Sequence, residues 1–388
     1  MNKLVTKFKG KLINLYYFIC RVIYGYKDAV VFESFGGKMY GDNCKPVSEA
    51  LHKLNPNIKI VWFFKNPDDK IGVVPEYVTC IAKNDKWGIC KWSAIAKVFV
   101  SNCALPTTPK GKKQFFVQLW HGDRPIKKVL YDGGTVAANH KLAEEIEGYC
   151  NLAVAGSEFG IKQYRTAFRY TGEVINVGSP RNDCLVNLDQ QHAKEIRKGL
   201  NIDEKTKLLL YAPTFRDTDR KKTSNQKQQD IDLSRTLETL KNKTGDNWVC
   251  LIRSHPAVVG FNGVEFGDNT INVTNYEDMA DLLMISDMVI TDYSTSASDY
   301  VISNRPAILY QSDIEDYMQN SRSIHFNMDE TPYFIAKNQK ELEDLIIGLT
   351  EEKVEENCKA VLEFYGANET GKSSYETAKR INDWIIKK

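Results

Sequence analysis

The stretch "QFFVQLWHGDRP", residues 114–125, changes abruptly from apolar to polar at His121. A short apolar run that ends in turn residues is typical of a strand buried on both faces of a parallel sheet. His121 then lies at the carboxyl end of that strand, where open parallel sheets bind their ligands. Gly122 follows it, and a glycine there permits a sharp turn or the close approach of a substrate.

Short runs of this kind alternate with helical patterns along the chain, which predicts parallel sheets covered by helices. The runs form two series, and two Rossmann-like halves that face one another would direct all their strand ends to a shared cleft. The expected strands are 29–35, 58–64, 97–102, 114–120, 151–156 and 174–178 in the first series, and 207–213, 247–254, 270–274, 287–292 and 306–311 in the second. Helices are expected at 186–206, 340–363 and 373–387, and a polar loop at 216–230.

The composition limits the class of protein. With 388 residues, 42% of them apolar, the chain is long enough for two hydrophobic cores. Its net charge of +2 does not favour nucleic acid as a partner. The nine cysteines contain no C-x-x-C pair and are odd in number, so we expect reduced thiols and no structural zinc site.

The first 27 residues carry six basic side chains, no acidic one, and many bulky apolar residues. The apolar run from Leu12 to Ile19 is shorter than the roughly 20 residues of a membrane span, and no signal-peptide cleavage site follows it. The composition favours a basic amphipathic helix that lies on an anionic membrane surface. The alternative is an ordinary helix packed on the body of the protein.

A second histidine occupies a position that corresponds to His121 in the other series. His255 lies just beyond the expected strand 247–254, in "IRSHP". An unperturbed histidine has a pKa of about 6.5, which suits proton transfer near neutrality. A lone histidine often only caps a strand, but two at matching strand ends favour a role in catalysis.

The segment 286–306 predicts an anion site. A strand runs through Asp292 and Tyr293 into a hydroxyl-rich helix start, Ser294-Thr295-Ser296. Free backbone N–H groups and the helix dipole favour anions at such a position, although a serine there also serves as an N-cap. No P-loop or dinucleotide-binding glycine motif is present. Three arginines lie at the ends of expected strands: Arg181, Arg216 and Arg253. Their guanidinium groups would suit a diphosphate, and the alternative is that they form surface salt bridges.

Six segments together resemble the CDP-glycerol glycerophosphotransferase family of teichoic acid synthesis, which includes glycerol and ribitol phosphate transferases. In order they are "VQLWHGDRPIKK", "GSPRND", "YAPTFRD", "IRSHP", "ISDMVITDYSTSASDY" and "RPAILYQSDIEDY". The resemblance implies an α/β fold of the GT-B type, with two Rossmann-like domains and a cleft between them. It also implies a peripheral enzyme on the cytoplasmic face of the cell membrane.

The resemblance assigns a role to each part of the chain. The expected parts are a membrane-associating helix (1–27), an acceptor domain (28–185), a CDP-donor domain (186–370) and a C-terminal helix that crosses back to the first domain (371–388). His121 and His255 are the expected catalytic residues. The expected donor-binding residues are Arg253, Asp292, Tyr293, Ser294, Thr295, Ser296, Arg181 and Arg216, and the expected acceptor-side residues are Gly122, Asp123 and Arg124.

The implied reaction begins when His121 removes a proton from an acceptor hydroxyl, whose oxygen attacks the β-phosphorus of CDP-glycerol while CMP leaves. CDP-glycerol is a substrate, and neither a cofactor nor a metal is expected. The acceptor would be a lipid-linked saccharide or a polyol phosphate chain. Asp123, Arg124 and Ser254 depart from the family pattern, which leaves the polyol and the acceptor open. The alternatives are transfer of ribitol phosphate or another polyol phosphate for a wall polymer or capsule, a GT-B sugar transferase, and an inactive scaffold.

Overall fold

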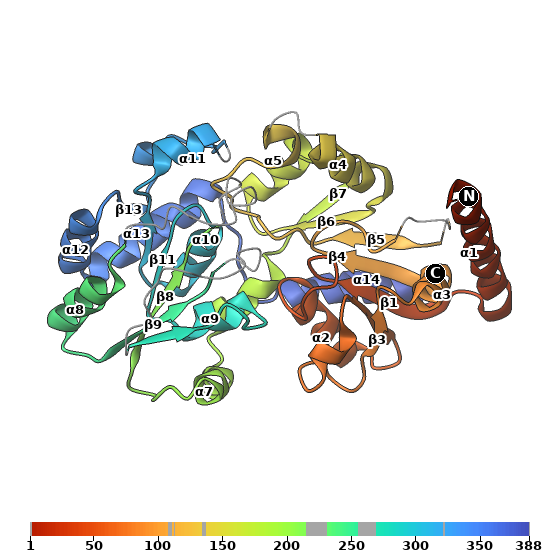
Figure 1. Cartoon of the computed structure of the whole chain (residues 1–388), viewed down its shortest axis with the longest axis horizontal. Coiled ribbons are helices and arrows are strands. Elements are labelled where there is room, and N and C mark those ends of the chain that lie inside the picture. The colour runs from red at the N-terminus through yellow and green to blue at the C-terminus, as the bar shows by residue number, and fades with distance from the viewer. Residues whose placement is uncertain are drawn as a thin grey trace.

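The computed structural model of the chain describes residues 2–107, 111, 113–133, 137–214, 231–254, 269–320 and 323–387. Two parallel sheets lie side by side, and helices cover both (Figure 1). The predicted loop at 216–230, Arg216 and His255 lie outside the described residues.

The first sheet has seven parallel strands in the order β3-β2-β1-β4-β5-β6-β7. Its central strands are almost wholly buried because they consist of aliphatic and aromatic residues, as the sequence predicts. The strands are β1 (Lys27–Glu33), β2 (Lys59–Phe64), β3 (Thr79–Ala82), β4 (Ala96–Ser101), β5 (Phe115–Gln118), β6 (Leu152–Ala155) and β7 (Glu173–Asn176).

The second sheet has six parallel strands in the order β10-β9-β8-β11-β12-β13. The strands are β8 (Lys207–Ala212), β9 (Trp248–Ile252), β10 (Thr270–Asn272), β11 (Met288–Thr291), β12 (Ala307–Tyr310) and β13 (Phe334–Ala336). The sequence did not predict β3 and β13. Both are short edge strands that are only partly buried, so neither produces a clear apolar run.

Fourteen helices are assigned within the described residues. They are α1 (Asn2–Tyr24), α2 (Cys44–Leu54), α3 (Lys86–Ile95), α4 (Ala137–Tyr149), α5 (Glu158–Thr166), α6 (Asp183–Asn187), α7 (Gln190–Gly199), α8 (Leu233–Thr244), α9 (Met279–Ile285), α10 (Ser296–Tyr300), α11 (Ile314–Asn320), α12 (Gln339–Gly348), α13 (Glu351–Tyr365) and α14 (Ser373–Lys387). The prediction of a single helix at 340–363 is wrong. It is split into α12 and α13 because Thr350 is an N-cap whose side chain accepts a hydrogen bond from the Lys353 N–H.

The end of the chain returns to the first domain. After Gly366, at φ +59°, Ala367 pairs with Ser157 and the Asn368 N–H bonds the Gly156 carbonyl. α14 then packs beside the first sheet, where Ala378, Ile381 and Ile385 join its core (Figure 1). The return begins a few residues before 371, so two segments of the chain connect the domains.

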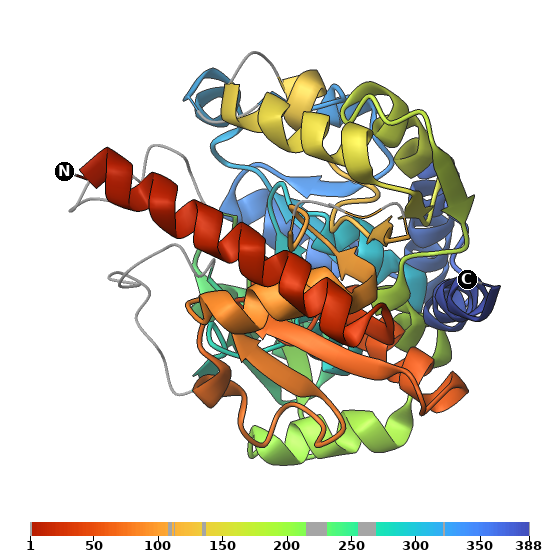
Figure 2. The same ribbon diagram turned by 90° about the vertical axis from the view of Figure 1, so that its right-hand side faces the viewer.

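The N-terminal helix α1 runs along the outside of the first domain (Figure 2). Tyr17 and Cys20 are buried against Cys90, Ala94 and Ile95 of α3. Another side of α1 leaves large apolar side chains exposed: Leu12, Leu15, Phe18, Ile19, Val22, Ile23 and Tyr24. None of the described helices is long and apolar enough to cross a membrane.

Candidate functional site

The topology brings particular strand ends together. In each sheet the strand order reverses next to the first strand, between β1 and β4 in the first sheet and between β8 and β11 in the second. Ligands of open parallel sheets bind at such switch points. Phe35, Asn102 and His121 follow β1, β4 and β5 at the first switch point, while Thr214 and Ser294 follow β8 and β11 at the second.

The environment of His121 determines which ring nitrogen carries a proton. Its Nδ1 lies 2.7 Å from the carbonyl oxygen of Asn102. Because a carbonyl oxygen only accepts hydrogen bonds, Nδ1 must donate, and the lone pair of the neutral ring is on Nε2. Burial lowers the pKa of His121 below its ordinary value of 6.5, although the charge of Asp42 opposes this shift. The ring is therefore neutral near pH 7 and able to accept a proton at Nε2.

The turn before His121 differs from the expectation. The left-handed residue is Trp120, with φ +47°, and not Gly122. The side-chain amide of Asn43 donates to the carbonyls of Trp120 (2.8 Å) and Leu119 (3.2 Å), which holds this unfavourable conformation. Gly122 instead marks a close approach. A Cβ added there would lie 3.7 Å from Cγ2 of Thr295, so the histidine loop lies directly against the hydroxyl-rich loop of the second domain.

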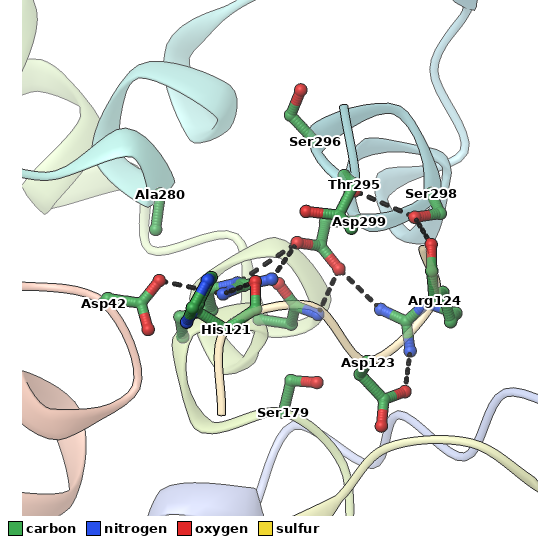
Figure 3. A network of polar contacts seen from close by, with 12 residues as sticks. Asp42, His121, Asp123, Arg124, Ser179, Ala280, Thr295, Ser296, Ser298 and Asp299 are labelled. Atoms are coloured by element: carbon green, nitrogen blue, oxygen red, sulfur yellow. Dashed lines mark hydrogen bonds and ion pairs between the residues drawn. The ribbon is translucent and has the colours of Figure 1, made fainter. Parts of the chain in front are cut away.

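Arg124 and Asp123, the expected acceptor-side residues, are both buried in a network that joins the domains (Figure 3). Their expected contact with the acceptor stays a prediction. Arg124 is 0% exposed and bonds Asp299 at 2.7 Å and Glu369 at 2.6 Å. Asp123 accepts a hydrogen bond from the Gly156 N–H at 2.8 Å. Burial opposes the charge of Arg124, but Glu369 and Asp299 keep its pKa above its ordinary value.

Arg181 links this network to the histidine. It lies on the 3-10 turn Pro180–Asn182, and its guanidinium bonds Asp299, Asp42 and the carbonyl oxygen of His121. These three partners use four of its five N–H groups, so Arg181 is held mainly by protein groups, and its expected contact with the donor stays a prediction. Arg181 is a positioning residue between His121 and α10.

The expected donor loop contains two kinds of residue. Asp292 and Tyr293 are buried, and Asp292 accepts hydrogen bonds from the Thr214 and Tyr293 N–H groups. The Tyr293 hydroxyl bonds Asp313, so these two residues shape the loop, and the donor contact expected for them stays a prediction. Ser294 and Thr295 are partly exposed, and the Ser294 hydroxyl accepts hydrogen bonds from the Ser296 N–H and hydroxyl. Because α10 has only five residues, its dipole adds little, and the hydroxyl and N–H groups must supply any anion site.

Arg253 follows β9 and retains a nitrogen that is free to donate. Its Nη1 is buried and has no hydrogen-bond partner among the described residues. Burial lowers the pKa of Arg253, and the charges of Asp278 and Glu277 oppose that shift. A buried guanidinium nitrogen without a protein partner suits an anionic ligand.

No group of three histidine, cysteine or acidic residues in the described part of the chain is arranged to hold a metal ion. The sequence contains two acidic pairs with Asp-x-Asp spacing, Asp217-Thr218-Asp219 and Asp230-Ile231-Asp232. Three of these four aspartates lie outside the described residues, and Asp232 is the N-cap of α8. The prediction that no metal ion takes part in the reaction therefore stays a prediction.

Sequence reasoning missed five polar residues that position the site: Asp42, Asn43, Asn102, Asp299 and Glu369. Four of them come from loops or from the returning segment, where an isolated polar residue carries no periodic signal. The sequence contains one weak indication that Asp299 belongs to the site, because this residue lies four positions beyond Thr295 in the hydroxyl-rich segment.

Known proteins resemble the chain over nearly its whole length. The teichoic acid poly(glycerol phosphate) polymerase of Staphylococcus epidermidis is 32% identical over 365 residues, which are 89% of this chain and 49% of that protein. The Bacillus spizizenii protein of the same name is 26% identical and aligns over 98% of this chain and 99% of its own length. The chain thus spans about half the length of the first relative and nearly all of the second.

A solved structure of the wall teichoic acid polymerase TagF superposes with a TM-score of 0.83 and 29% identity, over 99% of this chain and 95% of that one. This match confirms the GT-B fold predicted from the sequence, and the family resemblance is confirmed as well. The chain belongs to the CDP-glycerol:poly(glycerophosphate) glycerophosphotransferase family, whose sequence pattern matches residues 15–383.

Proposed function

We propose that the protein transfers glycerol phosphate from CDP-glycerol to a hydroxyl of a lipid-linked teichoic acid acceptor and releases CMP. The observation that supports this most directly is the position of His121. Its Nε2 is available as a base, and the loop that carries it is close to the hydroxyl-rich segment, since the Ser298 hydroxyl donates to the Arg124 carbonyl at 2.8 Å. A proton acceptor therefore lies beside groups suited to phosphate oxygens.

In the proposed mechanism, Nε2 of His121 takes the proton of the acceptor hydroxyl as its oxygen attacks the β-phosphorus. The bond between the β-phosphorus and the bridging oxygen breaks, and CMP leaves with that oxygen. Phosphoryl transfer depends mainly on positioning and on charge stabilisation. We assign the stabilisation to the Arg253 Nη1 and to the hydroxyl and N–H groups of Ser294–Ser296. Roles for His255 and Arg216 remain predictions of the family resemblance.

We further propose that this chemistry needs neither a cofactor nor a divalent metal. Arg253 and the Ser294 loop would supply the charge stabilisation that a metal gives in other phosphoryl transferases. Turnover should then be unchanged after dialysis against EDTA. Loss of turnover that Mg²⁺ or Mn²⁺ restores would contradict this part of the proposal and direct attention to Asp217 and Asp219.

We also propose that the protein works on the cytoplasmic face of the membrane and is held there by α1. One side of the helix packs on α3, while its exposed side carries bulky apolar residues. The N-terminal segment adds lysines, each worth about 1 kcal/mol near an anionic leaflet. The two interpretations of this helix, packed on the body or bound to a membrane, are therefore compatible.

The experiment that tests the function is a donor panel. The purified protein is incubated with CDP-glycerol, CDP-ribitol or a UDP-sugar and with a lipid-linked acceptor, and CMP release and product size are measured. We expect acceptor-dependent CMP release from CDP-glycerol. Preference for CDP-ribitol would establish the alternative polyol, consumption of the UDP-sugar would establish a sugar transferase, and no turnover with any donor would indicate a scaffold.

A further inference from the structure

A cavity of about 360 Å³ lies at the boundary of the two domains, and none of its lining residues is one of the strand-end residues described above. The first domain contributes Lys128, Asp132 and the side chains of α5, and the second contributes His325 and Phe326. The two walls are joined by an antiparallel bridge between Lys127 and Ile324. α5 and α11, which precedes this second wall, lie along the same edge of the molecule (Figure 1). The volume of the cavity is within the range of small-molecule sites.

The cavity has an excess of positive charge. Lys128 and Lys162 line it, and no ion pair of either is found within the described part of the chain. Burial is the main cause that lowers the pKa of His325, the charge of Asp132 opposes this shift, and the charges of Lys128 and Lys162 add to it. The only carboxylate of the lining is Asp132, which accepts a hydrogen bond from the Thr166 hydroxyl at 2.7 Å.

Two polar atoms of the lining lack a partner. Gln163 is only 2% exposed, and its Nε2 has no hydrogen-bond partner among the described residues. The Nε2 of His325 is also buried and unpaired there. Buried polar atoms are nearly always satisfied in folded proteins, so two unpaired ones in the wall of one cavity indicate a ligand.

The lining indicates the chemistry of that ligand. Two ammonium groups and an amide N–H are the donors that a phosphate requires. Asp132 can accept a hydrogen bond from a hydroxyl, and Phe159 offers an apolar face to CH₂ groups. A phosphate that carries a short polyol meets all three conditions.

The cavity is connected to the catalytic histidine through one short segment. Residues 121–128 run from His121 to Lys128, so the histidine and one lysine of the cavity belong to the same short segment. We propose that the cavity binds a glycerol phosphate unit already present in the acceptor, and so holds the acceptor chain while its terminal hydroxyl reaches His121. This inference rests on the proposed function and adds a second subsite to it.

The test measures binding without turnover. Calorimetry with a synthetic trimer of glycerol phosphate, in the absence of donor, is compared between the unsubstituted protein, the double variant Lys128→Gln/Lys162→Gln and the control Lys198→Gln/Lys241→Gln. The control changes the net charge equally on exposed helix positions of α7 and α8. Each lost ammonium–phosphate contact should weaken binding about tenfold. We therefore expect roughly a 100-fold increase in the Kd for the trimer in the cavity variant, little change in the control, and an unchanged Kd for CDP-glycerol in both.

Three outcomes would overturn the inference. They are an unchanged trimer Kd in the cavity variant, an equal loss in the control, and a parallel loss of CDP-glycerol affinity, which would assign the cavity to the donor. Vesicles of phosphatidylglycerol provide a further arm. Weaker vesicle binding with an unchanged trimer Kd would assign the cavity to a lipid headgroup. Failure of the proposed function looks different, because the trimer would then bind through the cavity lysines while no glycerol phosphate is transferred from CDP-glycerol.

Discussion

At the scale of single residues, the proposed chemistry depends on the proton of one imidazole. The Asn102 carbonyl holds that proton on Nδ1 of His121, and burial keeps the ring neutral. The surrounding groups fix the ring without taking its second nitrogen, since Arg181 bonds only the backbone carbonyl of His121. His121 is therefore oriented and still able to act as a base.

Replacement of His121 by alanine should lower kcat by a factor on the order of 100 to 10,000, the usual contribution of a general base. The Kd for CDP-glycerol should change little, because the donor is assigned to the second domain. Calorimetry and a CMP-release assay measure the two quantities. His52→Ala is a matched control, since His52 stacks on Tyr77 at the end of α2. Near-normal turnover of His121→Ala would remove the residue from the mechanism.

The pH dependence of turnover should show the same group. Burial is the main cause of the lowered pKa of His121, so protonation removes the base only when the pH falls below this pKa. We expect kcat to be constant around neutrality and to fall on the acid side, with a midpoint below 6.5. A profile of kcat between pH 5 and 8 measures this. An acid limb centred above pH 7 would be incompatible with a buried neutral imidazole.

The donor loop gives a second prediction at this scale. Ser294→Ala removes a hydroxyl that accepts hydrogen bonds from the Ser296 N–H and hydroxyl and that we assign to the donor phosphates. Loss of a hydrogen bond to a charged oxygen should weaken CDP-glycerol binding by about 1.5 to 3 kcal/mol. Calorimetry measures this Kd, and Ser303→Ala at the end of the same segment is the control. Equal affinities in the two variants would mean that Ser294 only organises its own loop.

At the scale of elements, α1 has one side that packs on α3 and another that is exposed, and the sequence did not show which residues belong to which side. The apolar residues of 1–27 predicted a helix, but its composition alone could not show which of them face α3. The structure places Tyr17 and Cys20 inside and leaves Phe18 66% and Val22 83% exposed. The membrane-binding proposal can therefore be tested without removing the packed side.

The triple variant Leu15→Ser/Phe18→Ser/Val22→Ser should lose co-sedimentation with anionic vesicles and keep its Tm, because these side chains are exposed. Each apolar side chain withdrawn from the interface removes about 1.5 to 3 kcal/mol of burial free energy. The control Ile71→Ser/Val73→Ser/Ile347→Ser changes three exposed apolar residues elsewhere. Vesicle binding that persists in the first variant, or is lost equally in both, would refute the role of α1.

At the scale of the whole molecule, buried charges join the two domains around the site. Arg124 and Arg181 come from the first domain, Asp299 from the second, and Glu369 from the segment that returns between them. Burial opposes ionisation of Asp299, but Arg181 and Arg124 hold its pKa below its usual value. The network thus fixes α10 and the neighbouring Ser294 loop relative to His121.

Arg124→Met should lower the free energy of unfolding by about 3 to 5 kcal/mol, because it leaves Asp299 and Glu369 buried with less compensating charge. Arg380→Met is the control. Its partner Glu173 is exposed, and such pairs contribute about 1 kcal/mol or less. Denaturant unfolding measures both variants. Similar small effects would show that the network does not hold the domains together.

The sequence predicted much of this architecture and little of the network. The strand runs identified eleven of the thirteen strands found in the described residues, since an apolar run records burial on both faces of a sheet. The same runs predicted site residues at His121 and in the Ser294 loop, because both lie directly at strand ends, and the variants above test that prediction. Glu369 and Asp42 could not be predicted, because they reach Arg124 and Arg181 only after distant segments meet. The sequence predicts ligand contacts for Arg181, Asp123 and Arg124 because it shows their charge, and only the structure shows their buried protein partners.

The central claim is that the glycerol phosphate group of CDP-glycerol, which contains the β-phosphorus, is transferred intact to the acceptor. CDP-glycerol labelled with ³²P at the β-position allows the most direct test, with a lipid-linked acceptor and with the protein or its His121→Ala variant. We predict that the label appears in the acceptor, that unlabelled CMP is released in equal amount, and that the variant forms product far more slowly. Label that remains with the nucleotide, or appears only as free glycerol phosphate in the presence of acceptor, would contradict the account.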